Sequence, residues 1–483
     1  MRYTEIAKAT PFEGAPKINT PRVFGASPKK PILIKICASG KRPMTYGAID
    51  LPEGLSLYNG IITGKVDGEG SYKITLKAKN ELGECKKQIT LEIKRDAVQL
   101  TPLMGFTSWN AFGYGVTQAD LEKTADRMSE LGLDEYGYNF INIDSGWQGE
   151  YGGKYDAIQP NEKFPDIKGF CDRMHSRGYR CGIYSTPMLH AFGTSMSYRP
   201  LPLGCTQGEP DDRFGEEHGG IGVIRKEKNN ALQWAEWGFD YLKYDWRPCD
   251  PYNAELMRAE LVKTERDFGF CVSVKARPEY HKYWEKYCSS YRCNPDSMGN
   301  WDNLMTIYRT YFDFIDYVNK GHYFDLDMLD LGRCILFEKL GFTEEKNFGY
   351  TEDEALVAYS MRAFLSSPIQ ISCTLETVSD FELSMYCNDE IIEINQDTAF
   401  SAARPVIMLE DGKKIIHVFK KKLAEGDTAY AVFNLGETEE TVNVYLDGES
   451  SIRDVWAKKD LPTASKITVA TKPHTVKIYR IAN

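Results

Sequence analysis

The sequence predicts three parts: a central (β/α)8 TIM barrel, an N-terminal immunoglobulin-like β-sandwich and a C-terminal antiparallel β-sandwich. Its 483 residues are enough for about three domains. Short apolar runs alternate with amphipathic helical stretches through the middle of the chain, whereas both ends contain only strand-like runs separated by turn residues. We therefore expect domain boundaries at residues 1–98, 99–398 and 399–483.

We predict that the first part consists of β-strands, because it contains apolar or alternating runs of strand length. Gly, Pro and Asn-Glu turns separate these runs, which cover residues 31–39, 60–66, 71–80 and 86–94. Their spacing suits a small immunoglobulin-like sandwich. The sandwich contains no tryptophan that could stack on a sugar, so we expect it to serve as a spacer or an oligomer contact. The segment RDAVQLTP, residues 95–102, is the expected linker.

The middle part contains eight strand-like runs with helical patterns between most of them. The runs cover residues 105–109, 138–144, 179–185, 240–245, 270–276, 289–294, 322–329 and 367–373. Apolar residues recur at helical spacing in residues 118–133, 167–178, 228–238 and 251–269. A doubly wound sheet also alternates strands and helices, but it seldom needs eight parallel strands. The sequence lacks the glycine-rich nucleotide signatures, and a barrel is the better interpretation.

The last part returns to a β pattern. Strand-like runs cover residues 413–423, 427–436, 440–448 and 474–482, separated by Asp-Gly, Glu-Gly and Pro-His turns. About 85 residues with this pattern predict an antiparallel sandwich.

Composition excludes several classes of function. The net charge of -10 offers no basic excess for nucleic acid. No apolar run approaches the roughly 20 residues of a membrane span, and the start of the chain has no apolar signal core. We therefore expect a cytoplasmic protein without nucleic-acid or membrane partners. The 12 scattered cysteines form no CxxC pair, so we expect buried free thiols rather than a zinc site.

Charged residues at the strand ends locate the candidate chemistry, because barrel active sites lie at the C-terminal ends of the strands. Such residues end or interrupt four of the runs: Asp144, Asp245, Lys275, and the pair Asp325 and Asp327. Alternation puts Lys243 on the same strand face as Asp245, where a buried cation would keep that carboxylate ionised. A single such Asp is usually a solvated strand end or a helix cap. The group fits a two-carboxylate glycosidase, and a divalent-metal site almost equally well.

Seven segments, in order over about 300 residues, resemble glycoside hydrolase clan D, family 27. They are TPLMGFTSW from Thr101, NIDSGW from Asn142, GIYS from Gly182, YLKYDW from Tyr241, Arg292 four residues before Asp296, FDLDML from Phe324 and EIIEINQD from Glu390. This family contains α-galactosidases and α-N-acetylgalactosaminidases. The resemblance implies a barrel with a C-terminal sandwich, a glycoside substrate, and neither a metal nor an organic cofactor. Whether the chain forms a homo-oligomer stays open.

The resemblance also implies roles for individual residues. Asp245 matches the family's nucleophile and Asp296 its acid/base, so hydrolysis would retain the anomeric configuration, with the carboxyl groups about 5–5.5 Å apart. Asp296 must then carry a proton when the substrate arrives, while Asp245 must be ionised with a low pKa. Six further residues match sugar-binding positions: Trp109, Asp144, Tyr184, Lys243, Arg292 and Asp327.

Departures from the family pattern put the exact sugar in question. Ser145 replaces the second acid of a pair that grips sugar hydroxyls in the family, and Lys275 lies where the family contacts the substituent at sugar position 2. Alternation would place Lys275 and Arg277 on one side, facing an unusual or anionic substituent. We include Ser145 and Lys275 among the expected substrate-binding residues. Arg247 replaces a cysteine, so a loop disulfide beside the nucleophile should be missing.

Two other functions stay open beside an α-galactosidase-like exo-glycosidase. One is a β-L-arabinopyranosidase or a related glycosidase with altered specificity, including one for a modified or acidic sugar. The other is an inactive carbohydrate-binding protein, against which the presence of both Asp245 and Asp296 argues. The long segment between Tyr184 and Asp245, rich in Gly and Pro, is expected to form a wall of the pocket.

Overall fold

The computed structural model describes residues 2–192, 201–211, 213, 219–342 and 349–482. At its centre, eight parallel strands follow one another in the order β20-β19-β18-β17-β14-β11-β10-β21. A parallel bridge between Leu329 and Ile371 joins the two ends of this series and closes the barrel. The strands are β10 (Met104–Thr107), β11 (Phe140–Asn142), β14 (Arg180–Ser185), β17 (Tyr241–Asp245), β18 (Gly269–Ser273), β19 (Ser290–Tyr291), β20 (Tyr323–Phe324) and β21 (Ile369–Ile371).

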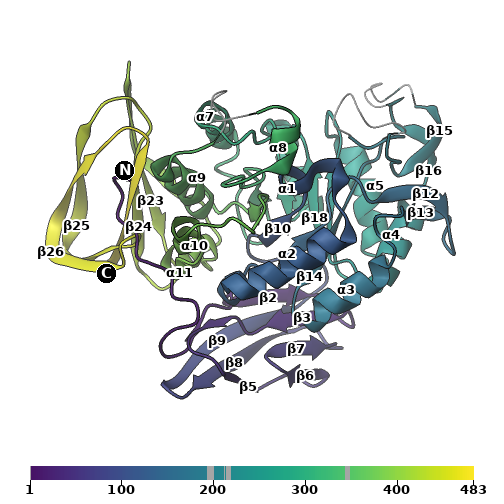
Figure 1. Ribbon diagram of the computed structural model, residues 1–483, viewed down its shortest axis with the longest axis horizontal. Coiled ribbons are helices and arrows are strands. Elements are labelled where there is room, and N and C mark those ends of the chain that lie inside the picture. The colour runs from purple at the N-terminus through teal and green to yellow at the C-terminus, as the bar shows by residue number, and fades with distance from the viewer. Residues whose placement is uncertain (1, 193–200, 212, 214–218, 343–348, 483) are drawn as a thin grey trace.

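Helices surround this barrel (Figure 1). They are α1 (Trp109–Phe112), α2 (Gln118–Leu131), α3 (Ile167–Ser176), α4 (Glu227–Trp237), α5 (Pro251–Leu261), α6 (His281–Tyr287), α7 (Trp301–Thr310), α8 (Ile335–Lys339), α9 (Glu352–Phe364), α10 (Asp380–Tyr386) and α11 (Asp389–Asn395). The described residues also include the short 3-10 turns η1 (Gly113–Gly115), η2 (Leu133–Tyr136), η4 (Pro278–Tyr280) and η5 (Tyr311–Asp313). Two antiparallel strand pairs lie outside the barrel: β12 (Gln148–Gly152) with β13 (Ala157–Pro160), and β15 (Thr206–Pro210) with β16 (Gly222–Arg225).

Helix α2 shows how local sequence defines these elements. Thr117 and Asp120 form a reciprocal capping box that satisfies backbone N–H groups at the start of the helix. Gly132 ends the helix with a φ of 75°, in the left-handed region that glycine adopts at little cost. Leu121 and Met128 lie on the buried face, which holds the helix against the barrel.

The N-terminal unit consists of two β-sheets with a shared apolar core. One sheet has the order β2-β9-β8-β5 and the other the order β3-β7-β6, and a short pair, β1 with β4, lies beside them. Strand β2 runs parallel to β9, whereas the other pairs within these sheets are antiparallel. The strands are β1 (Lys17–Ile18), β2 (Val23–Ala26), β3 (Ile32–Lys35), β4 (Ala38–Ser39), β5 (Thr45–Ile49), β6 (Leu55–Tyr58), β7 (Ile61–Gly64), β8 (Gly70–Asn80) and β9 (Gly83–Ile93).

This unit packs beside the N-terminal ends of the barrel strands, beneath the barrel in Figure 1. At the first residue of β14, Arg180 donates from Nη2 to the carbonyl of Leu33 over 3.0 Å. Ahead of β18, Asp267 accepts from the backbone N–H of Ser27 over 2.6 Å. The unit therefore lies at the end of the barrel opposite to the end where catalysis is expected.

The C-terminal part is a six-stranded antiparallel sheet of the order β22-β23-β24-β27-β25-β26. Strand β25 pairs with β26 along most of its length and with β27 through residues 451–454. The sheet thereby encloses its own apolar cluster, which includes Val432, Val444 and Ile467. The strands are β22 (Arg404–Asp411), β23 (Lys414–Lys422), β24 (Thr428–Asn434), β25 (Glu440–Asp454), β26 (Lys459–Thr471) and β27 (Thr475–Ala482).

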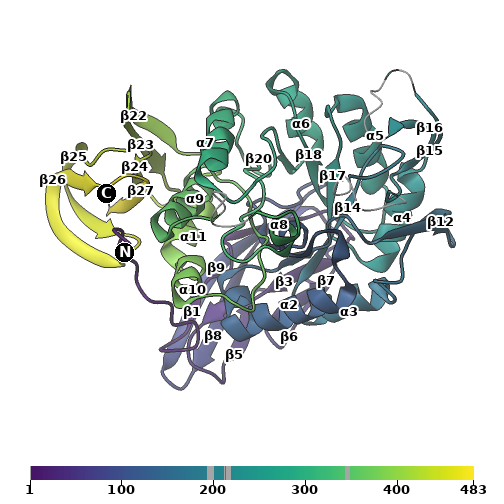
Figure 2. The same ribbon diagram turned by 45° about the horizontal axis from the view of Figure 1, so that its top comes forward.

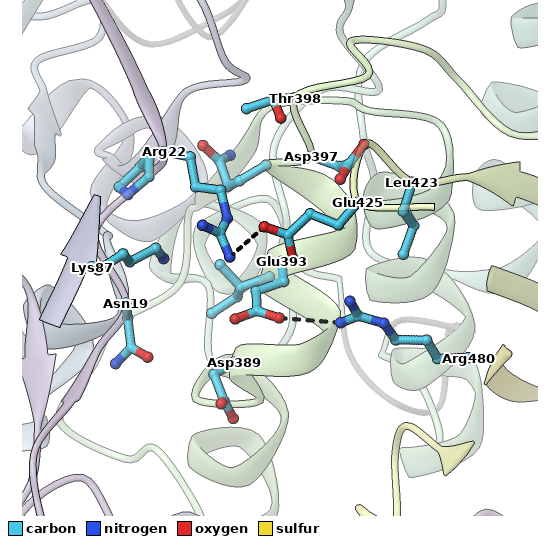
Figure 3. A pocket seen from close by; sticks show the side chains of 13 residues that line it. Asn19, Arg22, Lys87, Asp389, Glu393, Asp397, Thr398, Leu423, Glu425 and Arg480 are labelled. Atoms are coloured by element: carbon cyan, nitrogen blue, oxygen red, sulfur yellow. Dashed lines mark hydrogen bonds and ion pairs between the residues drawn. The ribbon is translucent and has the colours of Figure 1, made fainter. Parts of the chain in front are cut away.

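The three parts meet around a small cavity of about 50 Å³ (Figure 3). Arg22 of the N-terminal unit pairs with Glu425 of the C-terminal part over 3.0 Å. Arg480 of β27 pairs with Glu393 of α11 over 3.3 Å. These ion pairs link each terminal part to a neighbour, and the partly exposed ones among them add little stability individually.

Lys421 of β23 should make the stability of the protein depend on pH. Its buried ammonium donates to the carbonyls of Ala363 and Ile394 and to the hydroxyl of Ser366. Burial lowers the pKa of Lys421 to about 7 from 10.5. Because the unfolded chain then holds more protons between pH 7 and 10.5, this lysine makes the free energy of unfolding rise with pH across that window.

We expect Lys421→Met to remove this contribution, so that the free energy of unfolding rises by a few kcal/mol less between pH 7 and pH 9.5. The size follows from about 1.4 kcal/mol for each unit of pKa shift. Urea denaturation at several pH values measures the slope. The exposed neighbour Lys422, replaced in the same way, is the control and should keep the wild-type slope. Equal slopes for the wild type and Lys421→Met would show that the ammonium remains charged in the fold.

All twelve cysteines lie in described residues and are free, ten of them buried, as the sequence predicted. The loop disulfide that Arg247 precludes is accordingly missing beside Asp245. No helix in the described part of the chain is both long enough and apolar enough to cross a membrane.

Candidate active site

A pocket of about 280 Å³ opens at the C-terminal ends of the barrel strands. Figure 2 looks toward this end of the barrel, with α8 over its centre. Residues in or after seven of the eight strands line the pocket: Trp109, Asn110, Asp144, Ser145, Tyr184, Phe192, Lys243, Asp245, Arg247, Val274, Arg292, Asp296, Ser297, Met298, Asp327, Met328, Leu336, Phe337 and Leu340. All the catalytic and substrate-binding candidates except Lys275 are among them, whereas Asp325, the other charged strand-end residue, is buried outside the pocket lining.

Asp245 ends β17 and is only 8% exposed. Its Oδ2 accepts a hydrogen bond from the hydroxyl of Tyr184 over 3.1 Å. Its buried Oδ1 has no hydrogen-bond partner among the described residues, although buried carboxylate oxygens normally have one. One oxygen is thus held in place while the other is left for a ligand.

The pKa of Asp245 differs from the low value that we expected. Burial raises the pKa of Asp245 above its usual range, more than the cations Lys243 and Arg292 lower it. Asp296 and Asp144 raise the pKa further because like charges oppose ionisation. The two cations counteract these effects only in part.

Lys243 contacts Asp144 directly, and its charge also lowers the pKa of Asp245, in the direction expected from their shared strand face. Its Nζ donates to Oδ2 of Asp144 over 2.8 Å and lies 5.5 Å from the centre of the Tyr184 ring. Burial alone would lower the pKa of Lys243, but Asp144 and Asp245 outweigh it and raise that pKa above its usual range. The hydroxyl of Ser108 fixes the position of Asp144 by accepting from its backbone N–H over 2.9 Å.

Arg292, which follows β19, joins two carboxylates. It is 4% exposed, and its Nη1 pairs with Oδ2 of Asp327 over 2.7 Å while its Nη2 donates to Oδ1 of Asp296. The backbone N–H of Ser297 also donates to Asp327 over 2.7 Å. Asp296, by contrast, has a side chain that is 69% exposed, so it lies where the pocket meets solvent.

The predicted position of Lys275 in the pocket is wrong. We expected a strand over residues 270–276, but β18 ends at Ser273, and Lys275 has a φ of 60°, so strand alternation no longer applies there. Val274 lines the pocket instead. Lys275 and Arg277 are exposed, and Arg277 lies 3.7 Å from Glu279.

Sequence patterns did not identify the apolar part of the wall. Met298, Met328 and three residues in or next to α8, namely Leu336, Phe337 and Leu340, line the pocket without any charge or motif that marks them. Asn110 and Ser297 next to recognised motifs were also missed. Phe192 lies in the long segment after β14, which we expected to form a wall. Residues 193–200, 212 and 214–218 of that segment lie outside the described residues.

The carboxylates of the pocket do not gather into a metal-binding group. Lys243 neutralises Asp144, and Arg292 lies between Asp296 and Asp327. In the described part of the chain, no three His, Cys, Asp or Glu side chains come close enough to hold one ion. The arrangement is instead suited to many charged hydrogen bonds around one reactive carboxylate.

The chain matches known protein families over most of its length. Residues 101–200 and 216–397 match the family described as alpha galactosidase A, and residues 413–481 match the alpha galactosidase C-terminal beta sandwich domain. Among curated proteins, alpha-galactosidase 2 of Arabidopsis thaliana is 26% identical over 408 residues, covering 80% of this chain and 91% of the plant protein.

Two solved structures from Bacteroides fragilis extend over the N-terminal unit as well. One, described as a putative alpha-galactosidase, has a TM-score of 0.84 with 28% identity and covers 99% of this chain and 100% of its own. The other, described as a putative alpha-galactosidase/melibiase, has a TM-score of 0.84 with 29% identity and covers 98% and 99%. The TIM-barrel-like fold and the C-terminal sandwich are thereby confirmed.

Proposed function

Since this chain belongs to the alpha-galactosidase A family, glycoside hydrolase family 27, we propose that it is a retaining exo-glycosidase that removes terminal α-galactosyl residues. The single observation that carries the proposal is Asp245, a buried carboxylate with one oxygen held by Tyr184 and the other without a partner, facing a pocket of sugar size. Asp134 also has a buried oxygen without a partner, but among the carboxylates that line the pocket only Asp245 does so in the described part of the chain.

In the first step, the free oxygen of Asp245 attacks the anomeric carbon of the sugar as the glycosidic C–O bond breaks. Asp296 gives its proton to the departing oxygen, and a covalent glycosyl-enzyme forms. The attack needs the ionised form of Asp245, which Lys243 and Arg292 favour against the burial that raises its pKa. Tyr184 keeps the other oxygen in position during the attack.

In the second step, Asp296 takes a proton from a water molecule, and the resulting hydroxide attacks the anomeric carbon from the side that the leaving group vacated. The bond to Asp245 breaks, and its carboxylate is restored. The exposed position of Asp296 suits this role because leaving group and water both approach from solvent. Two displacements at one carbon give net retention.

Three groups would hold the sugar during these steps. We assign the charged hydrogen bonds to hydroxyl groups to Lys243 with Asp144 and to Arg292 with Asp327, because each pair lies fixed in the wall. Trp109 is half-buried in the wall and offers an apolar ring face. Ser145 lies beside Asp144 on the same strand end.

A panel of nitrophenyl glycosides tests the function. We expect hydrolysis of the α-galactoside, with α-galactose as the first anomer seen by NMR before mutarotation. The β-galactoside should not react, and the β-L-arabinopyranoside should react more slowly. A first-formed β-galactose would contradict the retaining mechanism, and faster release from the arabinoside would assign the protein to that sugar.

For the N-terminal unit we propose an immunoglobulin-like domain over residues 1–98, followed by the catalytic barrel over 99–398 and the sandwich over 399–483. The two packed sheets, with β2 parallel to the last strand β9, support the immunoglobulin-like assignment. Its contacts with the end of the barrel remote from the pocket favour a supporting role rather than sugar binding.

A further inference from the structure

Asp296 depends on its loop for its position. This loop follows β19 and leads into α7, and the side chain of Asp296 is 69% exposed, so packing does little to hold it. A proton donor must be aligned with the glycosidic oxygen, and a displacement of about 1 Å can cost roughly 100-fold in rate. The backbone at Asp296 therefore has to be fixed by contacts that its neighbours in the loop make.

Ser297, the next residue, is held through both of its polar groups. Its backbone N–H donates to Oδ2 of Asp327 over 2.7 Å. Its hydroxyl donates a hydrogen bond that both carboxylate oxygens of Asp330 share, over 2.9 and 3.0 Å. Ser297 and Asp330 are only 3% and 2% exposed, so water does not compete for this bond. Both aspartates lie in the loop after β20, and Ser297 joins that loop to the loop that carries Asp296.

The bond between Ser297 and Asp330 is charge-assisted. Burial raises the pKa of Asp330 to about 6, while the cation Arg362 and the hydroxyl of Ser297 lower it. Asp330 is therefore ionised at neutral pH, and a hydroxyl that donates to a carboxylate makes a stronger bond than one that donates to a neutral group. Among the described residues, Ser297 lines the pocket but Asp330 does not, so Asp330 lies behind the pocket wall.

The loop after β20 is itself firmly held, so it can serve as a fixed support. Arg362 of α9 is 2% exposed and donates from Nη2 to the backbone carbonyls of residues 326–328 over 3.3, 3.1 and 2.8 Å. Asn303 of α7 also holds the acid/base loop, donating from Nδ2 to the carbonyl of Asp296 over 3.0 Å, but that contact is exposed. The buried bond from Ser297 to Asp330 is the better protected of the two.

We propose that Asp330 is a positioning residue for the acid/base Asp296, and that it acts through the hydroxyl of Ser297. The inference rests on the proposed function, since it assigns Asp330 a part in the same reaction. Asp330 touches neither the sugar nor the reacting atoms. Loss of its bond to Ser297 lets the backbone of Asp296 move, which impairs proton transfer to the leaving oxygen. The attack by Asp245 is not affected.

The leaving group distinguishes this role from a purely structural one. Dinitrophenolate leaves with little help from a proton, whereas the more basic phenolate needs a proton donor. The test compares kcat/KM for 2,4-dinitrophenyl and phenyl α-galactoside, because kcat/KM reports the first displacement. In Ser297→Ala and in Asp330→Ala, we expect the value for the phenyl substrate to fall by about 10- to 100-fold and that for the dinitrophenyl substrate by less than about threefold. Equal losses on both substrates overturn the inference.

A second serine and aspartate in the barrel provide the matched control. The hydroxyl of Ser129 donates to Oδ2 of Asp134 over 3.0 Å, and Asp134 is 4% exposed. In the part of the chain that the structure describes, neither residue lines the pocket. Ser129→Ala and Asp134→Ala remove the same kind of bond, and both should keep the wild-type ratio of the two kcat/KM values. If they change this ratio as much as Ser297→Ala does, the ratio reports general destabilisation and the inference is wrong.

The double variant tests whether the two residues act through one bond. Ser297→Ala removes a single oxygen atom, so the comparison of substrates stands even if Asp330→Ala does not fold. Where both variants fold, the double variant should lose no more activity on the phenyl substrate than the more impaired single variant, because both changes break the same bond. Losses that multiply would show that the residues act separately, which also overturns the inference.

Hydrogen exchange separates failure of this inference from failure of the proposed function. If the wild type hydrolyses no α-galactoside, the proposed function has failed, but the effect of the bond on the loop can still be measured. Amide exchange of the full chain, followed by mass spectrometry of peptides that span residues 292–300, should be faster by about tenfold or more in Ser297→Ala. In Ser129→Ala it should match the wild type. Unchanged exchange of this segment in Ser297→Ala would show that the bond does not fix the loop, and would overturn the inference.

Discussion

Replacing Asp245 with Asn should lower kcat on 4-nitrophenyl α-galactoside by about 10,000-fold or more, the scale on which enzymes lose a nucleophile. The amide keeps the shape of the side chain and can still contact Tyr184, but its oxygen cannot form a stable ester with the anomeric carbon. Steady-state and single-turnover release of nitrophenol measure the loss, and the second experiment excludes a change confined to the deglycosylation step.

A companion variant identifies the lost step. Asp245→Gly opens space beside the anomeric carbon, so added azide should attack that carbon, displace nitrophenolate and give β-galactosyl azide. NMR identifies the anomer. The inverted product follows because one displacement replaces two. An α-azide, or full activity of either variant, would contradict the assignment of Asp245.

The control for this prediction is Asp250→Asn, an identical change five residues along the chain. Asp250 caps α5, accepting from the backbone N–H of Asn253 and from Nε1 of Trp246, both over 2.9 Å. The oxygen of Asn can keep the cap on the backbone of Asn253, but its NH2 group cannot accept from Nε1 of Trp246 or Nδ2 of Asn253, so we expect a loss of about 1–3 kcal/mol of stability in a folded protein. Activity should stay within a few-fold of the wild type, which separates chemistry from folding.

Much of the fold follows from periodicity, because each of the eight predicted barrel runs overlaps a strand of the structure. Periodicity does not predict the strand lengths. Strands β19 and β20 have only two residues each, because the rest of each predicted run is a loop, and these loops carry Arg292 and Asp327. Strands β22 and β26 were missed. Both are largely exposed, so an apolar run does not mark them.

The site was predictable to the extent that charge marks it. Asp144, Lys243 and Asp245 end or interrupt strands, and barrel geometry brings such ends together. The partner of Lys243 was not predictable, because that contact reaches from β17 past β14 to the end of β11 and depends on side-chain reach. The position of Lys275 was also not predictable from alternation, because side chains alternate only while the backbone stays extended, and the backbone of Lys275 does not.

Loss of Arg292 should have the second largest effect, on stability and activity together. Arg292→Met leaves Asp327 buried with the backbone N–H of Ser297 but without its cation. We expect the free energy of unfolding to fall by about 3–5 kcal/mol, the usual cost of removing one partner of a buried ion pair. Urea denaturation measures this loss. The value of kcat/KM should fall by at least about 100-fold, because Asp327 and Asp296 lose their fixed positions.

Arg277→Met removes an exposed arginine and should cost less than about 0.5 kcal/mol, which controls for the loss of charge. The double variant Arg292→Met with Asp327→Asn tests the cause. If the cost comes from an uncompensated buried carboxylate, making Asp327 neutral should recover part of the stability, so the two changes together cost less than their sum. Activity should not recover, since the sugar still lacks both charged partners. Additive losses of stability would show instead that Arg292 acts through packing, and that Asp327 does not depend on its charge.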